Sequence, residues 1–124
     1  MVVAAKIYQW LIWLVLLALP VQFLLAGLGV MGGEEIDPHQ GLGSLIQLIV
    51  IVLFLVSLLG RMGKPTIMMT LTLLVLSILQ SIWAAEDLDP QWLRSLHVLD
   101  ALLMSALVYH LATRVGMPMR SGAS

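Results

Sequence analysis

The chain has 124 residues, about the size of one domain, and its net charge is −1. Hydrophobic residues make up 60% and charged residues 10%, whereas about 25% of an ordinary soluble domain is charged. Because so short a chain cannot bury that much apolar surface, a water-soluble monomer is excluded. The absence of cysteine excludes disulfides, iron–sulfur clusters and thiolate metal sites. The six basic residues form no dense patch, which argues against nucleic acid as a partner.

Four apolar stretches are long enough to cross a lipid bilayer, whose hydrocarbon core of about 30 Å requires about 20 helical residues. They cover approximately residues 8–30, 41–60, 65–85 and 96–113 of a single transmembrane domain, 1–124. The first stretch exceeds the apolar region of a typical signal peptide, so we expect a retained helix. The short connections make neighbouring helices antiparallel. The sequence therefore predicts an all-α integral membrane protein, an up-down-up-down four-helix bundle.

The distribution of charge predicts the orientation of this bundle. Arg94 is the only basic residue in the first and third connections, which hold six of the seven acids. The other five basic residues lie at the termini and in the middle connection: Lys6, Arg61, Lys64, Arg114 and Arg120. By the positive-inside rule, we expect both termini on the cytoplasmic side of a prokaryotic cytoplasmic (inner) membrane.

Both acidic connections end in Asp-Pro, at Asp37-Pro38 and Asp89-Pro90. Asp is a good N-cap residue, and Pro is tolerated at the first helical position. We therefore expect the second helix to start at Pro38, and an extra turn or two over residues 90–95 before the fourth helix.

An internal repeat links the two halves of the sequence. Gln22 and Gln80 near the ends of the first and third helices are each followed by an acidic connection, Asp-Pro and a histidine. A small residue follows each histidine four positions later, giving the pairs His39–Gly43 and His97–Ala101. This pattern predicts two pseudo-repeated hairpins, in which the second and fourth helices are diagonal partners.

Each predicted helix carries one polar side chain at a similar depth, about 21–24 Å from the cytoplasmic charges at 1.5 Å per residue. These residues are Gln22, Gln47, Gln80 and Asp100. Glutamines in membrane helices commonly hydrogen-bond to neighbouring helices. An acid at this depth is costly and needs a partner. His97, three residues earlier on the same face, is the expected partner of Asp100, and Arg94 is the competing one.

Three groups of residues carry a resemblance to a known family. They are Gln22 with Ala26-Gly27-Leu28-Gly29, His39 with Gly43, and Leu96-His97 with Asp100-Ala101-Leu102-Leu103. The chain resembles a family of small four-helix prokaryotic membrane proteins that is catalogued as a domain of unknown function. The family pattern has Asn where this chain has Asp100, and the resemblance implies no activity. At the level of fold, the chain is also similar to four-helix b-type membrane cytochromes, which hold haem between histidines on facing helices.

Two functions fit these features. The first is a non-catalytic subunit or scaffold of a larger membrane complex, in contact with the lipid bilayer and other subunits. The alternative is a b-type haem protein for electron transport, with His39 and His97 as iron ligands near the outer face. Asp100 would then orient His97, and Gln22 and Gln80 would contact the macrocycle or a quinone, with Gly43 making room.

A mismatch of about 7 Å in the predicted depths of the two histidines opposes the haem hypothesis, although helix tilt reduces it. A transport or proton path is disfavoured because the inner half of each span has few ionisable groups. The sequence has no Ser/His/Asp set, H-E-x-x-H motif or Gly-rich phosphate loop, so a non-enzymatic role is favoured.

Overall fold

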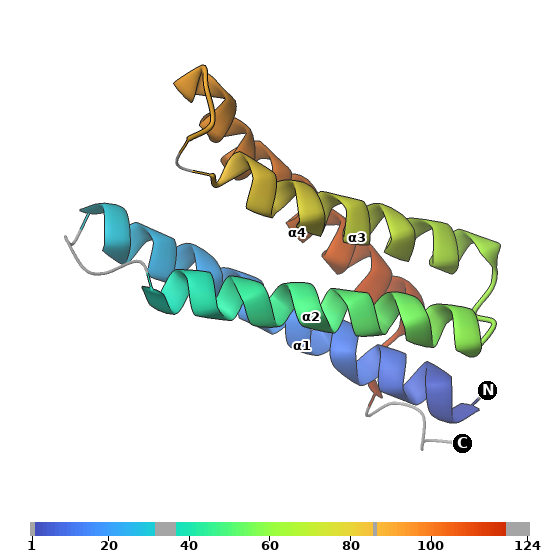
Figure 1. Ribbon diagram of the computed structural model, residues 1–124. Helices are drawn as coiled ribbons and strands as arrows, with labels where there is room; N and C mark the ends of the chain where they lie inside the picture. The colour runs from blue at the N-terminus through green and yellow to red at the C-terminus, as the bar shows by residue number, and fades with distance from the viewer. Residues whose placement is uncertain (1, 32–36, 86, 119–124) are drawn as a thin grey trace.

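The computed structural model describes residues 2–31, 37–85 and 87–118, which fold as four long helices (Figure 1). Within this part of the chain there is no strand, so the all-α prediction is confirmed. All four helices are long and apolar enough to cross a membrane. The short 3₁₀ helix η1 leads into the last of them. In chain order the elements are α1 (Val2–Met31), α2 (Asp37–Leu59), α3 (Lys64–Trp83), η1 (Gln91–Ser95) and α4 (Leu96–Val115).

The largest departure from the predicted helix boundaries is at the start of α1, while α3 ends two residues earlier and α4 two residues later than predicted. α1 begins six residues earlier than predicted because the apolar and small residues around Lys6 continue the helix. α2 begins at Asp37 rather than Pro38. The extra turn before α4 is confirmed as η1. The predicted N-cap role of Asp89 is wrong, because Pro90 occupies the N-cap position of η1 in an extended conformation and no side chain caps it.

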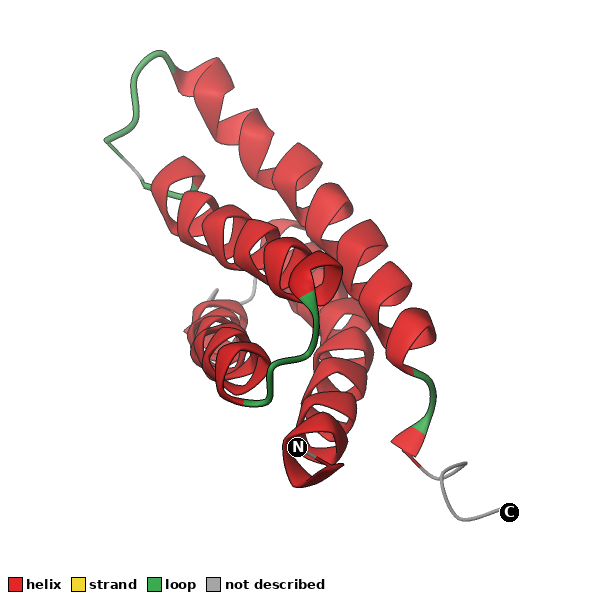
Figure 2. Cartoon of the chain, turned by 90° about the vertical axis from the view of Figure 1, so that its right-hand side faces the viewer, coloured by secondary structure: helices red, strands yellow, loops and turns green. Residues whose placement is uncertain are grey.

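The helices form a ring in which each one packs against its two neighbours. Contacts join α1 to α2, α2 to α3, α3 to α4 and α4 back to α1 (Figures 1 and 2). Over the described residues no such contact joins α2 to α4, so these two helices are diagonal partners as predicted. The end of the bundle where α1 and α3 end and where α2 and η1 begin is called the pocket end. The opposite end, where α1 begins and α4 ends, is called the termini end (Figure 1).

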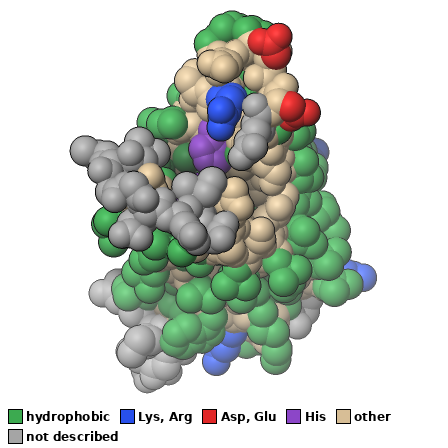
Figure 3. Space-filling view, turned by 60° about the vertical axis from the view of Figure 1, so that its left-hand side comes forward, with side chains coloured by type: hydrophobic (Ala, Val, Ile, Leu, Met, Phe, Trp, Pro, Cys, Tyr) green, Lys and Arg blue, Asp and Glu red, His purple; other side chains and the backbone are tan. Residues whose placement is uncertain are grey.

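The outward faces of the helices are strongly apolar. Hydrophobic side chains cover much of the surface below the pocket end (Figure 3). Leu17, Leu24 and Leu102 are each more than half exposed. Isolated apolar residues are normal on a soluble protein, but a continuous apolar surface is not. These faces suit contact with the hydrocarbon of a bilayer.

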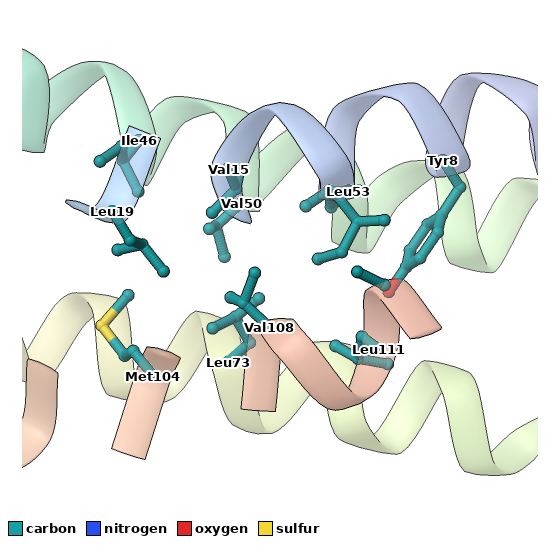
Figure 4. Packing of buried hydrophobic residues seen from close by; sticks show 12 residues of the cluster. Tyr8, Val15, Leu19, Ile46, Val50, Leu53, Leu73, Met104, Val108 and Leu111 are labelled. Carbon is teal, nitrogen blue, oxygen red and sulfur yellow. The ribbon is translucent and has the colours of Figure 1, made fainter. Parts of the chain in front are cut away.

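The core runs along the bundle axis and repeats between the hairpins. On α1, the buried residues Tyr8, Val15 and Leu19 face the axis (Figure 4), and Ile12 is buried with them. The residues 58 positions later on α3 are buried as well: Thr66, Thr70, Leu73 and Ser77. Because the same positions of each helix are buried, the predicted pseudo-repeat extends through the core as well as the histidine motif.

Polar side chains close the termini end. The buried Tyr8 hydroxyl lies 2.6 Å from Thr70 Oγ1, which joins α1 to α3 across the axis. Gln9 Nε2 donates to the Val115 carbonyl at 2.6 Å, and Trp13 Nε1 donates to the Gly116 carbonyl at 3.0 Å. These two bonds satisfy carbonyl groups at the end of α4, where no intrahelical donor remains. The termini end is therefore a closed, hydrogen-bonded base for the pocket end.

Candidate functional site

A cavity of about 950 Å³ occupies the pocket end, between the two hairpins. Side chains from all four helices line it, including Gln22 of α1, His39 of α2, Gln80 of α3 and His97 of α4, and Arg94 of η1 also contributes. A histidine lies in the hollow beside a basic side chain (Figure 3). Five of the predicted site residues therefore border one space: Gln22, His39, Gly43, Gln80 and His97.

The two histidine rings meet across the cavity. The ring centroids of His39 and His97 are 6.1 Å apart, and the ring planes are inclined at 75°. His97 lies only one residue inside α4, directly after η1, and the two hairpins diverge toward this end (Figure 1). The depth mismatch estimated for straight, parallel helices therefore does not separate the rings.

His39 is held by reciprocal hydrogen bonds to Gln22. His39 Nδ1 lies 3.1 Å from the backbone carbonyl oxygen of Gln22, and Gln22 Nε2 donates to the His39 carbonyl at 2.7 Å. A carbonyl oxygen only accepts hydrogen bonds, so this contact places the ring proton on Nδ1. Nε2 of the neutral ring then carries the lone pair that a metal ion or a proton donor would use.

His97 and Gln80 repeat this arrangement in the second hairpin. His97 Nδ1 lies 3.2 Å from the Gln80 backbone carbonyl oxygen. When the Gln80 amide is assigned so that both its atoms find partners, its nitrogen donates to the His97 carbonyl at 3.1 Å. Its oxygen then accepts from the Ala101 N–H at 3.0 Å. In this orientation the amide nitrogen is also 2.6 Å from His97 Nδ1, so this ring nitrogen faces a donor as well as an acceptor.

Gly43 allows Gln22 to approach α2 closely. A Cβ atom built on Gly43 would lie 2.8 Å from Gln22 Nε2, closer than real Cβ contacts. Ala101, at the equivalent position of α4, carries a Cβ and bonds Gln80 through its backbone N–H. Both small residues that follow the histidines therefore lie against a glutamine, Gly43 through close approach to the Gln22 amide and Ala101 through a backbone hydrogen bond to Gln80.

The predicted pairing of Asp100 with His97 is wrong. Asp100 is buried, and within the described residues neither carboxylate oxygen has a hydrogen-bond partner. The His97 ring is instead engaged by Gln80 of the neighbouring helix, and Arg94 does not pair with the carboxylate either. Asp100 is also absent from the residues that line the cavity. A spacing of three residues permits contact along a helix, but here the interhelical bond of His97 replaces it.

Other polar residues of the cavity were outside the predicted site. Gln47, Ser77 and Ser81 line its wall between α2 and α3. Gln47 Nε2 donates to the Ser77 carbonyl, and Ser81 Oγ donates to Gln47 Oε1. Each donor–acceptor distance is 3.5 Å. These are weak bonds at the limit of hydrogen-bonding distance. The shared depth of the three glutamines was the available clue to Gln47, whereas the serines carried no distinguishing pattern.

The described residues offer few groups that bind a bare metal ion. They contain no group of three or more His, Cys, Asp or Glu side chains that could hold one. Zinc sites need three or four protein ligands. The cavity thus provides two imidazoles, five amides and an arginine around a wall that is otherwise made largely of small and apolar residues.

The fold and the cavity define a multi-pass helical membrane protein with a histidine pair at one end of its bundle. A family model described as "Family of unknown function (DUF6220)" matches residues 22–86, just over half of the chain. The chain belongs to this family. The matched segment includes Gln22, His39 and Gln80, whereas His97 lies beyond it. Neither the curated proteins nor the solved structures yield a match.

Proposed function

We propose that this protein binds haem b between His39 and His97 and carries electrons at the pocket end. The observation that carries the proposal is the histidine pair, with its ring centroids 6.1 Å apart and each Nδ1 against a backbone carbonyl. A metal ion midway between two imidazole nitrogens, at about 2 Å from each, brings the ring centres to roughly 6 Å. The observed spacing is therefore suitable for one iron with two axial histidines.

The hydrogen bonds of the histidines support a role as ligands. Metal-binding histidines almost always donate their other ring N–H to a carboxylate, a backbone carbonyl or water, which fixes the tautomer and orients the ring. His39 makes such a contact with Gln22. His97 Nδ1 lies 3.2 Å from the Gln80 carbonyl oxygen and would donate to it in the proposed ligand form, in which the nearby Gln80 amide nitrogen donates only to the His97 carbonyl. Gln22 and Gln80 act here as positioning residues.

The ligand count favours haem over a bare ion. A haem iron already has four porphyrin nitrogens and needs only two more ligands, which two histidines supply. A bare zinc or copper ion would need further side chains, and no suitable group of three or more occurs in the described ranges. Gly43, Ala26, Ala84 and Ala101 line the cavity and leave room for a flat macrocycle. Its volume of about 950 Å³ lies at the upper end of ordinary ligand sites.

A bound haem supplies reversible one-electron chemistry, and this chain's residues would tune it. Axial ligation, hydrogen bonds to the ligands and burial are the protein's means of setting the potential. We infer from the asymmetry of basic residues that the termini face the cytoplasm of a prokaryotic cell and the pocket end faces outward. A quinone as redox partner and a role as subunit of a larger complex remain predictions.

The visible spectrum of the purified protein tests the proposal. The protein in mild detergent, supplemented with haemin, is expected to give a Soret band that His39→Ala and His97→Ala each abolish or shift. His110→Ala is the matched control, because this third histidine lies on the exposed surface of α4 outside the cavity. The absence of a Soret band in the wild-type protein would overturn the proposal. An unchanged band in both cavity variants would do the same.

A further inference from the structure

Arg94 gives the cavity a charge that the pseudo-repeat does not supply twice. It belongs to η1, which precedes α4, and the corresponding position before α2 is Ile36. Among the described residues it is the only Lys or Arg that lines the cavity. In the sequence it is also the only Lys or Arg in the first and third connections. The cavity thus has two equivalent histidines but a positive charge on one side.

The guanidinium of Arg94 has no partner in the part of the chain that the structure describes, where no hydrogen bond or ion pair engages its side chain. Arg94 is exposed, three residues before His97, so it lies at the cavity rim rather than on its floor. Arginine presents five donors in a planar fork that matches a carboxylate or phosphate. A free arginine at the mouth of a cavity that is apolar over most of its wall suits a ligand with an apolar body and an anionic end.

We propose that Arg94 binds the carboxylates of the ligand in this cavity and so sets which edge of the ligand faces the mouth. The inference rests on the proposed function, in which the ligand is a porphyrin carrying two propionate groups. The propionates would lie at the rim with Arg94, where water completes their solvation, and the apolar edge of the ring would lie deeper between the hairpins. Because only the second hairpin contributes a cation, the site has a single preferred orientation despite its pseudo-symmetric histidines.

The test compares haemin with haemin dimethyl ester, in which both carboxylates are blocked. Each probe is titrated into detergent-purified wild-type protein, Arg94→Gln and Arg94→Lys, and binding is followed at the Soret band. The wild type is expected to bind haemin more tightly than the ester by about 3- to 10-fold, the range of a partly exposed charge-assisted contact. Arg94→Gln loses most of this preference, and Arg94→Lys, which keeps the charge without the fork, retains part of it.

Two features of the design isolate the carboxylate contact. The ratio of the two affinities is compared between variants, so the stronger partition of the ester into detergent cancels. Lys64→Gln is the matched control, because it removes an exposed positive charge at the opposite end of the bundle. Lys64→Gln is expected to keep the wild-type preference for haemin.

The redox potential gives a second readout. A positive charge beside the haem stabilises its reduced form, so Arg94→Gln is expected to lower the midpoint potential more than Lys64→Gln does. If wild type and Arg94→Gln discriminate equally between the two probes, the role of Arg94 is overturned while the haem proposal stands. If the wild type binds neither probe, the haem proposal fails and the Arg94 proposal fails with it.

Discussion

In the α1–α2 hairpin the buried side chains are apolar apart from Tyr8 and Ser57, whereas the α3–α4 hairpin buries Thr66, Thr70, Ser77 and Asp100. In both hairpins, by contrast, the histidine Nδ1 lies against a glutamine backbone carbonyl and the glutamine amide nitrogen donates to the histidine carbonyl. The amide oxygens differ, because that of Gln80 accepts from the Ala101 N–H while that of Gln22 has no partner among the described residues. The two hairpins thus share the geometry of the cavity while their cores differ in polarity. The cavity geometry is the feature that the internal repeat preserves.

The polar residues of the second hairpin are not equivalent in energy. Thr70 bonds Tyr8 and the Thr66 carbonyl, and Ser77 donates to the Leu74 carbonyl. Asp100 alone among them is buried with both side-chain oxygens unpaired in the described structure. A buried polar group with a partner costs little, whereas one without a partner keeps its full desolvation penalty. The comparison of hairpins therefore identifies Asp100 as the costly departure from the repeat.

Exchange of Asp100 for the residue at its repeat position, together with the reverse exchange, should have the largest effects. That residue is Leu42, which packs against the core. We expect Asp100→Leu to raise the free energy of unfolding by about 2 kcal/mol, because an unpaired buried carboxyl is removed. Asp100→Asn, which keeps the shape without the acid, should give a smaller gain. Both are measured by denaturant unfolding in detergent micelles.

The reverse exchange is the control for this prediction. Leu42→Asp places an acid at the equivalent position of the first hairpin and is expected to cost about 3 kcal/mol. A lower free energy of unfolding in Asp100→Leu would contradict this prediction. It would show that the Asp100 carboxyl has a stabilising partner, although the described residues give it none.

Gly43 offers a sharper comparison between the hairpins. Gly43→Ala is expected to be less stable than Gly41→Ala by about 1 kcal/mol, because the new Cβ would lie 2.8 Å from Gln22 Nε2 and displacing this amide breaks its bond to the His39 carbonyl. Gly41→Ala is the matched control in the same helix, where a Cβ meets nothing within 4 Å. That variant should be neutral or gain up to about 1 kcal/mol from helix propensity. Equal losses in both variants would contradict the close approach of Gln22.

Much of the fold follows from the sequence because it depends on properties of whole segments. Four apolar runs of bilayer length predict four helices, and an identical spacing of Gln, His and a small residue predicts the paired hairpins. The meeting of His39 and His97 followed from the diagonal placement of their helices. The estimated mismatch in depth failed as an objection because it assumed straight, parallel helices, whereas the hairpins diverge toward the pocket end (Figure 1).

The errors concern choices between local partners. Sequence spacing allowed Asp100 to reach His97, but it could not show that the ring bonds Gln80 on another helix. Asp89 resembled an N-cap, yet η1 starts at Gln91, one residue too late for it. The rim position of Arg94 depends on this short 3₁₀ helix, which has no periodic sequence pattern. Side-chain partners across helices depend on the packed structure, and one sequence does not specify them.

The hydrogen bond between Tyr8 and Thr70 joins the two hairpins at the termini end, whereas at the pocket end the hairpins diverge. Tyr8→Phe removes the hydroxyl but leaves Thr70 Oγ1 bonded to the Thr66 carbonyl, so no buried group becomes unpaired. We therefore expect a loss of only about 1 kcal/mol in the free energy of unfolding. Tyr109→Phe, on an exposed ring of α4, is the control and should change stability by less than about 0.5 kcal/mol. Equal effects of the two substitutions would mean that the hydroxyl does not join the hairpins, and that apolar packing alone closes the termini end.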